Sequence, residues 1–314
     1  MRLSKIGIFL PGQHGDIMSA MSVLKYKDRL WPGKEIIWFC ATPRSEVLKF
    51  NDAITEVRHW PEGYGLPERC VVDGPQAVAK GEPMWEDFSV LKTANNRLNQ
   101  ALKYNFESTK DLEEGYFPAP WMMSVAERDG IEYPNISRKI FGADPSWEWH
   151  PYLGFSNEER EMVKEFCSTL PHKKTVMMET FLGSGAHQWS DDMTKRSMTM
   201  CRNRFGAVNF IFASHTDHKR FVDDVGVVSC GHFSVRQTAL VNNYADLFIG
   251  VGSGISVATS CWGNKPTPKI QYTGSRIGST AALANGPFEL FEYDHDRNAQ
   301  QNYFHKLVDM LDKL

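Results

Sequence analysis

The sequence predicts an α/β protein made of two doubly wound domains, each a parallel sheet with helices on both faces. Apolar runs of strand length alternate with segments of helical period in both halves of the chain. The length of 314 residues is about twice that of one ordinary domain. Residues 141–156, rich in Pro, Gly and Trp, interrupt the alternation and are typical of a linker. We therefore expect an N-terminal domain over residues 1–150 and a C-terminal domain over residues 151–314, facing a cleft.

The first half contains three expected strands separated by helical segments, followed by a stretch of weak periodicity. Strands are expected at 3–10, 35–40 and 53–61, and helices at 16–30, 43–51 and 87–105. Residues 113–131 are expected to form a loop that leads into a helix.

The second half repeats the rhythm and opens with a helix-start capping box, because Ser156 is followed three residues later by Glu159. Strands are expected at 174–180, 208–214, 225–231, 245–251 and, as the last one, 268–273. Helices are expected at 156–170, 193–205, 219–225, 234–244, 255–263 and 302–314. The last of these helices is a candidate to pack back on the first domain.

Composition excludes several classes of protein. The net charge is −3 with no run of Lys and Arg, which is unlike a chain built mainly to hold nucleic acid. No stretch of 18 apolar residues predicts a membrane span, and Pro11 interrupts the N-terminal apolar run too early for a secretory signal. The six cysteines form no C-x-x-C pair, which argues against a zinc knuckle and suits a cytoplasmic protein.

The loops that follow the expected strands concentrate Gly, Ser, His and Asp. In such sheets ligands bind beyond the carboxyl ends of the strands. Gly252, Ser253 and Gly254 lie between a strand and a helix, where free amides and the helix dipole attract phosphate. A plain strand-to-helix turn explains this pattern about equally well. The loop over 181–192 offers further donor contacts or a flexible turn, and its candidates are Ser184, Gly185, His187 and Gln188.

The first loop, "PGQHGD", matches neither a dinucleotide fingerprint nor a P-loop. Its Asp16 falls in the first turn of a helix, where it is either a cap or a base that faces the cleft. His215 has Asp217 and His218 beside it, but these adjacent loop residues lack a distant third ligand. The Asp294–Asp296 stretch reads as a solvated loop, so no metal site is expected.

Taken together, these loops resemble the ADP-heptose:lipopolysaccharide heptosyltransferases, glycosyltransferase family nine, which have the GT-B fold. Gly15-Asp16 matches the family's first glycine-rich turn, and residues 31–40 match its next strand. Residues 234–266 resemble its strongest motif, with Ser253-Gly254 on the family's Thr-Gly and Lys265-Pro266 on its Lys-Pro. Three contacts depart from the pattern, because the family's Asp, His and Lys fall on Gly252, Val257 and His187.

The resemblance implies a glycosyltransferase that moves a sugar from a nucleotide-diphosphate sugar to an acceptor hydroxyl, inverting and without metal or other cofactor. It implies that Asp16 is the general base, and we expect His14 to orient the acceptor. The diphosphate is expected against Ser253 and Gly254, and the nucleotide base near His215, Tyr272 and Thr273.

The acceptor stays open, with a glycan or lipid-linked glycan favoured over DNA. One alternative is a DNA glycosyltransferase acting on a hydroxymethylated base, for which Lys92, Arg97 and Lys103 are candidate contacts. Another is a nucleotide-sugar-binding protein that keeps the scaffold without catalysis.

Overall fold

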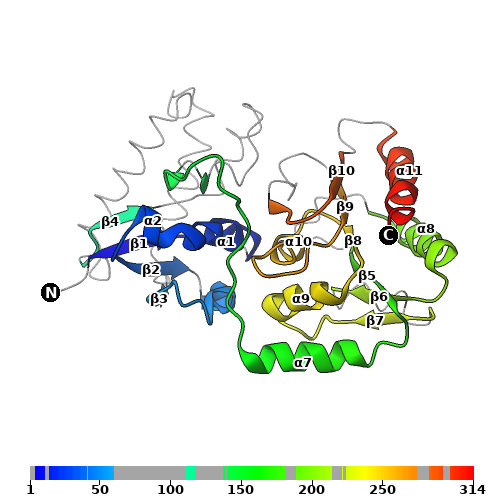
Figure 1. Cartoon of the computed structure of the whole chain (residues 1–314), viewed down its shortest axis with the longest axis horizontal. Coiled ribbons are helices and arrows are strands. Elements are labelled where there is room, and N and C mark those ends of the chain that lie inside the picture. Colours follow the sequence, from blue (N-terminus) through cyan, green and yellow to red (C-terminus); the bar gives the residue numbers. More distant parts are fainter. Residues whose placement is uncertain are drawn as a thin grey trace. The chain divides into compact units, whose positions relative to one another are not determined.

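The computed structural model describes residues 4–10, 14–40, 42–59, 111–116, 137–138, 140–180, 189–213, 221, 224–273, 283–292 and 298–314. The chain divides into two compact units, Met1–Gly154 and Phe155–Leu314 (Figure 1). The helix expected at 87–105 lies outside the described residues.

The first unit contains a four-stranded sheet, in which every described pair of neighbouring strands is parallel and the order is β3-β2-β1-β4. Its strands are β1 (Lys5–Phe9), β2 (Glu35–Cys40), β3 (Glu56–His59) and β4 (Glu114–Tyr116). The first three confirm the strands predicted from the apolar runs. The described helical segments are α1 (His14–Met21), η1 (Ser22–Tyr26), α2 (Lys27–Leu30) and η2 (Thr42–Leu48). The single helix predicted at 16–30 is therefore three segments, because the 3₁₀ helix η1 separates α1 from α2.

Strand β4 corrects the prediction of a loop at the start of residues 113–131. Its sequence, Glu114-Gly115-Tyr116, contains no apolar run and no strand signal of its own. Pairing with β1 creates the strand, with Ile6 opposite Glu114 and Ile8 opposite Tyr116. Long-range hydrogen bonding thus overrides local propensity here.

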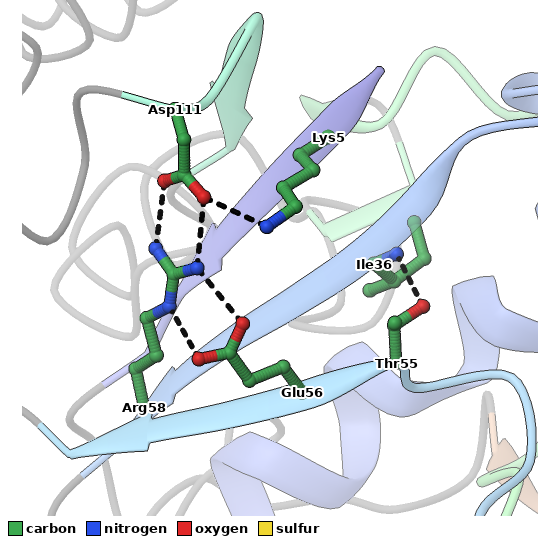
Figure 2. A network of polar contacts seen from close by, with 6 residues as sticks. All are labelled: Lys5, Ile36, Thr55, Glu56, Arg58 and Asp111. Atoms are coloured by element: carbon green, nitrogen blue, oxygen red, sulfur yellow. Dashed lines mark hydrogen bonds and ion pairs between the residues drawn. The ribbon is translucent and has the colours of Figure 1, made fainter. Parts of the chain in front are cut away.

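A charged network holds the approach to β4 against β1 and β3 (Figure 2). Arg58 donates to both carboxylate oxygens of Asp111 at 2.8 and 3.0 Å, and Lys5 donates to Asp111 at 2.8 Å. Arg58 also donates twice to Glu56, both times at 2.8 Å. The hydrogen bonds from Arg58 hold the pKa of Asp111 well below its usual range. Bidentate pairing of this kind fixes geometry as well as charge.

The second unit contains a six-stranded sheet in the order β10-β9-β8-β5-β6-β7, in which every described pair of neighbouring strands is parallel. The described strands are β5 (Lys174–Glu179), β6 (Val208–Phe212), β7 (Val227–Ser229), β8 (Leu247–Gly250), β9 (Lys269–Thr273) and β10 (Phe288–Glu292). Numbered within the unit, the order is 6-5-4-1-2-3, the doubly wound arrangement of nucleotide-binding sheets. The chain reverses direction across the sheet between β5 and β8.

Helices cover both faces of this sheet (Figure 1). The described helical segments are α7 (Asn157–Ser168), α8 (Asp191–Phe205), α9 (Val235–Val241), η6 (Asn242–Tyr244), α10 (Gly254–Ala258) and α11 (Ala299–Leu311). Apolar residues of α8 and α11 pack on one face of the sheet, and those of α7 and α9 pack on the other. Tyr303, Phe304 and Leu307 of α11 belong to the core of the second unit, because that face of its sheet needs an apolar cover. That the C-terminal helix also packs on the first domain stays a prediction.

Strand β10 corrects a second prediction, since 268–273 was expected to be the last strand. Residues 288–292 read Phe-Glu-Leu-Phe-Glu, and their three apolar residues directly after Pro287 are a short strand signal that the apolar-run reading did not include. The strand lies at the edge of the sheet and pairs with β9 over five residues. The predicted helix at 219–225 falls largely outside the described residues, and its described positions lie in turns and bends.

The capping box predicted at Ser156 is confirmed and is extended by a buried ion pair. The Ser156 hydroxyl accepts from the Glu159 amide, and the Glu159 carboxylate accepts from the Ser156 amide. The other oxygen of that carboxylate accepts from Arg236 of α9. Glu159 and Arg236 are both buried, so one carboxylate starts α7 and also ties α7 to α9.

Replacing Glu159 with alanine should lower the free energy of unfolding by about 3–5 kcal/mol, because a buried guanidinium loses its partner. Denaturant unfolding measures the change. The matched control is Glu161→Ala on the same helix, whose exposed pair with Lys164 should contribute less than about 1 kcal/mol. A loss for Glu159→Ala no larger than that of the control would contradict the assigned role.

Candidate functional site

The carboxyl ends of β5 and β8 meet at the topological switch point of the second unit. Glu179 ends β5 and lies opposite Gly250, which ends β8. A Cβ atom at position 250 would lie 2.4 Å from the Glu179 carbonyl oxygen, so this approach requires glycine. Just beyond, the Val251 amide donates to the same oxygen at 2.9 Å. Open sheets of this order bind ligands at this point.

The turn from β8 into α10 emerges directly from this switch point. Ser253 is the N-cap of α10, and its hydroxyl accepts from the Ser256 amide at 3.2 Å. The Ser253 amide donates to the Ser256 hydroxyl at 2.9 Å. The predicted Gly252-Ser253-Gly254 turn is thus a capped helix start. It uses the Ser253 hydroxyl and amide internally, which the sequence did not reveal.

The amides of the next two residues, Gly254 and Ile255, are the ones that this capping leaves for an external acceptor. They are the first two residues of α10, and amides at these positions lack a partner within the helix. Within the described part of the chain, no hydrogen bond is found from either amide. Amide groups in this position, together with the helix dipole, favour an anion.

A fully buried lysine of β9 donates hydrogen bonds to α10 and to the residues that follow it. The Lys269 ammonium donates to the Thr259 hydroxyl at 2.7 Å, the Ser260 hydroxyl at 2.5 Å and the Ser256 carbonyl at 3.3 Å. It also lies 5.4 Å from the centre of the Phe248 ring. Burial lowers the pKa of Lys269 to about 7. These contacts fix the body of α10, and so the direction of its first turn.

Two more buried polar residues lie beside the switch point, and the sequence analysis missed both. Glu179 is 4% exposed, and Gln271 of β9 is fully buried and pairs with Gly250 in register. The Gln271 side-chain amide donates to the Val251 carbonyl at 3.3 Å. The available signals were a polar residue between Ile270 and Tyr272 in β9 and an acidic residue directly after the apolar run of β5. Such a buried polar side chain needs a hydrogen-bond partner, which for Gln271 is the Val251 carbonyl just after β8.

The other predicted donor residues divide into two groups. Tyr272 is a core residue that packs edge-on against Trp189 and Tyr303, at 6.2 and 6.0 Å between ring centres. Thr273 ends β9. The remaining predicted contacts lie outside the described residues: Ser184, Gly185, His187, Gln188 and His215.

Lys265 and Pro266, which match the family motif, lie in the connection between α10 and β9, and Lys265 holds this connection in place. The Lys265 ammonium donates to the Ala245 carbonyl at 3.0 Å, and the Lys265 amide donates to the Asn243 side chain at 2.7 Å. The preceding Asn264 donates to the Ala239 carbonyl at 2.8 Å. These bonds secure the segment between α10 and β9 to α9 and to the start of β8.

In the first unit, His14 and Asp16 both lie in the first turn of α1, which follows β1. The helix dipole stabilises a carboxylate in this position. The His14 Nε2 atom lies 3.7 Å from the Glu46 carboxylate, and Glu46 belongs to η2, which follows β2. Two successive strand-to-helix connections thus bring an imidazole and two carboxylates to one edge of the sheet. Sequence patterns do not reveal Glu46, because its partner lies far away in the chain on another element.

Within the described residues, no group of three or more His, Cys, Asp or Glu side chains is arranged to hold a metal ion. None of the helices found there is long and apolar enough to cross a bilayer.

Comparison with solved structures identifies similar folds over nearly the whole chain. A glycosyl transferase family 9 protein from Veillonella parvula DSM 2008 has a TM-score of 0.64 and 11% identity, over 100% of this chain and 99% of that one. E. coli ADP-heptose LPS heptosyltransferase II has a TM-score of 0.61 and 12% identity, over 98% and 99%. E. coli heptosyltransferase WaaC with ADP has a TM-score of 0.52 and 12% identity, over 96% and 99%.

These similarities confirm the GT-B fold class predicted from the sequence, with two parallel α/β units that resemble those of family-nine heptosyltransferases. At 11 to 12% identity they establish the fold alone. Neither the comparison with protein-family models nor the search of curated proteins finds a match.

The burial of Lys269 predicts a pH-dependent stability. Between its native pKa of about 7 and the ordinary value of 10.5, the unfolded chain binds a proton that the native chain does not. The free energy of unfolding contributed by Lys269 therefore rises with pH, by up to about 1.4 kcal/mol per pH unit. Denaturant unfolding of the wild type and of Lys269→Met, measured from about pH 6 to about pH 10, isolates the contribution of Lys269. The buried thiols contribute equally to both proteins and cancel in the comparison.

The free energy of unfolding of the wild type minus that of Lys269→Met should increase as the pH rises above about 7. A difference between the two proteins that stays constant with pH would contradict the prediction. It would mean that the ammonium stays charged among its three acceptors.

Proposed function

We propose that this chain is a glycosyltransferase that moves a sugar from a nucleotide-diphosphate sugar to an acceptor hydroxyl. The observation that carries the proposal is the fold likeness to family-nine glycosyltransferases over at least 96% of both chains in three structures. It is supported by the capped turn at the β5–β8 switch point and by Asp16 in the first turn of α1.

On the donor side, the diphosphate binds the Gly254 and Ile255 amides, beside Gly252 and the N-cap Ser253. Amides in the first turn of a helix, together with the helix dipole, favour such an anion. Ser184, Gly185, His187 and Gln188 complete the diphosphate contacts. The nucleotide base lies near His215 and the end of β9 at Tyr272 and Thr273. Because WaaC has been solved with ADP, adenine nucleotides are the first donors to test.

On the acceptor side, Asp16 takes the proton from the acceptor hydroxyl while the oxygen attacks the anomeric carbon. The bond from that carbon to the diphosphate breaks, and its electron pair leaves with the nucleotide. Attack opposite the leaving group inverts the anomeric centre. Amide groups and the α10 dipole offset charge on the leaving diphosphate, so the reaction proceeds without a metal ion.

The preferred acceptor is a glycan or a lipid-linked glycan, handled in the cytoplasm. Two alternatives make different experimental predictions. A DNA glycosyltransferase would retain DNA at low salt and lose it steeply as salt rises. A non-catalytic binder would bind a nucleotide sugar but neither hydrolyse nor transfer it.

Replacing Asp16 with asparagine should lower the transfer rate by about a hundredfold or more, because the neutral amide cannot accept the proton. Donor affinity, measured by calorimetry, should change by less than about twofold, since Asp16 belongs to the acceptor side. Asp28→Asn is the matched control, because Asp28 is exposed on the nearby α2. Unchanged transfer in Asp16→Asn would exclude Asp16 as the base, and lost donor binding would exclude its assignment to the acceptor side.

Replacing Gly254 with proline should weaken binding of the nucleoside diphosphate about tenfold, because it deletes one amide donor to a charged group. Proline suits the first helical position, and the extended backbone of Ser253 (φ −126°, ψ 170°) tolerates a following proline. Gly254→Ala keeps the amide and should bind nearly as the wild type does. Equal affinity for ADP in the proline and alanine variants, measured by calorimetry, would rule out this phosphate contact.

A further inference from the structure

The first unit brings together three ionisable residues at the carboxyl ends of β1 and β2, and one of them has no role so far. His14 and Asp16 lie on α1, and Glu46 lies on η2 with its carboxylate 3.7 Å from the His14 Nε2 atom. The His14 and Glu46 side chains are 31% and 34% exposed, while the His14 Nε2 atom that faces Glu46 is itself buried.

The separation is that of an ion pair when the imidazole is protonated. A carboxylate at this distance stabilises the charged imidazolium and fixes the direction of the ring. The other charged residues of the two segments are Asp16 on α1 and Arg44 on η2, and both are unchanged in any substitution of Glu46.

We propose that Glu46 is a positioning residue that holds His14 as a charged hydrogen-bond donor to the acceptor, next to the base Asp16. This inference rests on the proposed function and deepens it. His14 donates to an acceptor oxygen neighbouring the reacting hydroxyl, while Asp16 removes the proton of that hydroxyl. The two residues then need opposite protonation states, Asp16 ionised and His14 protonated.

This division of roles gives the transfer reaction a bell-shaped pH profile. The acid limb reports ionisation of Asp16, and the alkaline limb reports loss of the proton from His14. Removing the Glu46 charge should move only the alkaline limb, and it should move to lower pH. Because the pair is partly exposed, the expected shift is about half a pH unit.

The test compares Glu46→Gln with wild type in two measurements. The first is an NMR titration of the His14 imidazole in the substrate-free protein, which needs no ligand. The second is the pH profile of ADP release from an ADP-sugar in the presence of a glycan acceptor. Glu46→Asp keeps the charge and should retain most of the wild-type profile. Glu35→Gln, at the opposite end of β2, removes the same charge at a distance and should change neither measurement.

The expected result is a downward shift of about half a pH unit in both the His14 titration and the alkaline limb, with a raised acceptor KM. An unchanged His14 titration would overturn the inference whatever the activity. A shift of the acid limb instead would also overturn it, because His14 would then act as a base. Absence of transfer in the wild type is a separate outcome, which overturns the proposed function while the titration still decides the His14–Glu46 pairing.

Discussion

The close approach of β5 and β8 is the constraint on which the rest of the second unit depends. Gly250 lets the two strands meet at the Glu179 carbonyl, and the Val251 amide then bonds to that oxygen. From this point the chain turns through Ser253 into α10, while Lys269 and Gln271 hold the turn and the helix from β9. The orientation of two backbone amides therefore follows from a backbone contact and two buried polar side chains.

The first unit reaches a comparable arrangement with different means. Asp111, Arg58 and Lys5 secure β4 beside β1 through charged hydrogen bonds across the sheet, as Figure 2 shows. The helical connections after β1 and β2 then carry His14, Asp16 and Glu46 to the same edge. Each unit thus places its candidate chemistry at the carboxyl ends of parallel strands, as the fold class leads one to expect.

Local patterns predicted the parts of the fold that depend on local physics. Apolar runs located β1, β2, β5 and β8, and the Ser156–Glu159 spacing located the start of α7. Strand β4 was missed because only pairing with β1 makes it a strand. The sequence did not locate the sheet that α11 covers, because the apolar face of a helix does not specify its partner.

The same division holds for the site. Asp16 and the Gly252–Gly254 turn were found because their meaning depends on near neighbours at a helix start. Glu46, Lys269 and Gln271 were missed because each acquires its meaning from a residue on another element. The Ser253 amide was expected to bind phosphate, but a reciprocal bond with Ser256 occupies it, a detail that residue types alone do not specify.

Binding of a nucleoside diphosphate at the β8–α10 turn is the contact on which the proposed reaction depends. An NMR titration of the isotopically labelled protein with ADP, followed through its backbone amides, tests this contact. We expect saturable shifts at Gly254 and Ile255, the two amides at the start of the helix. Binding of ADP that leaves both amides unshifted, or no binding of any nucleoside diphosphate, would contradict it.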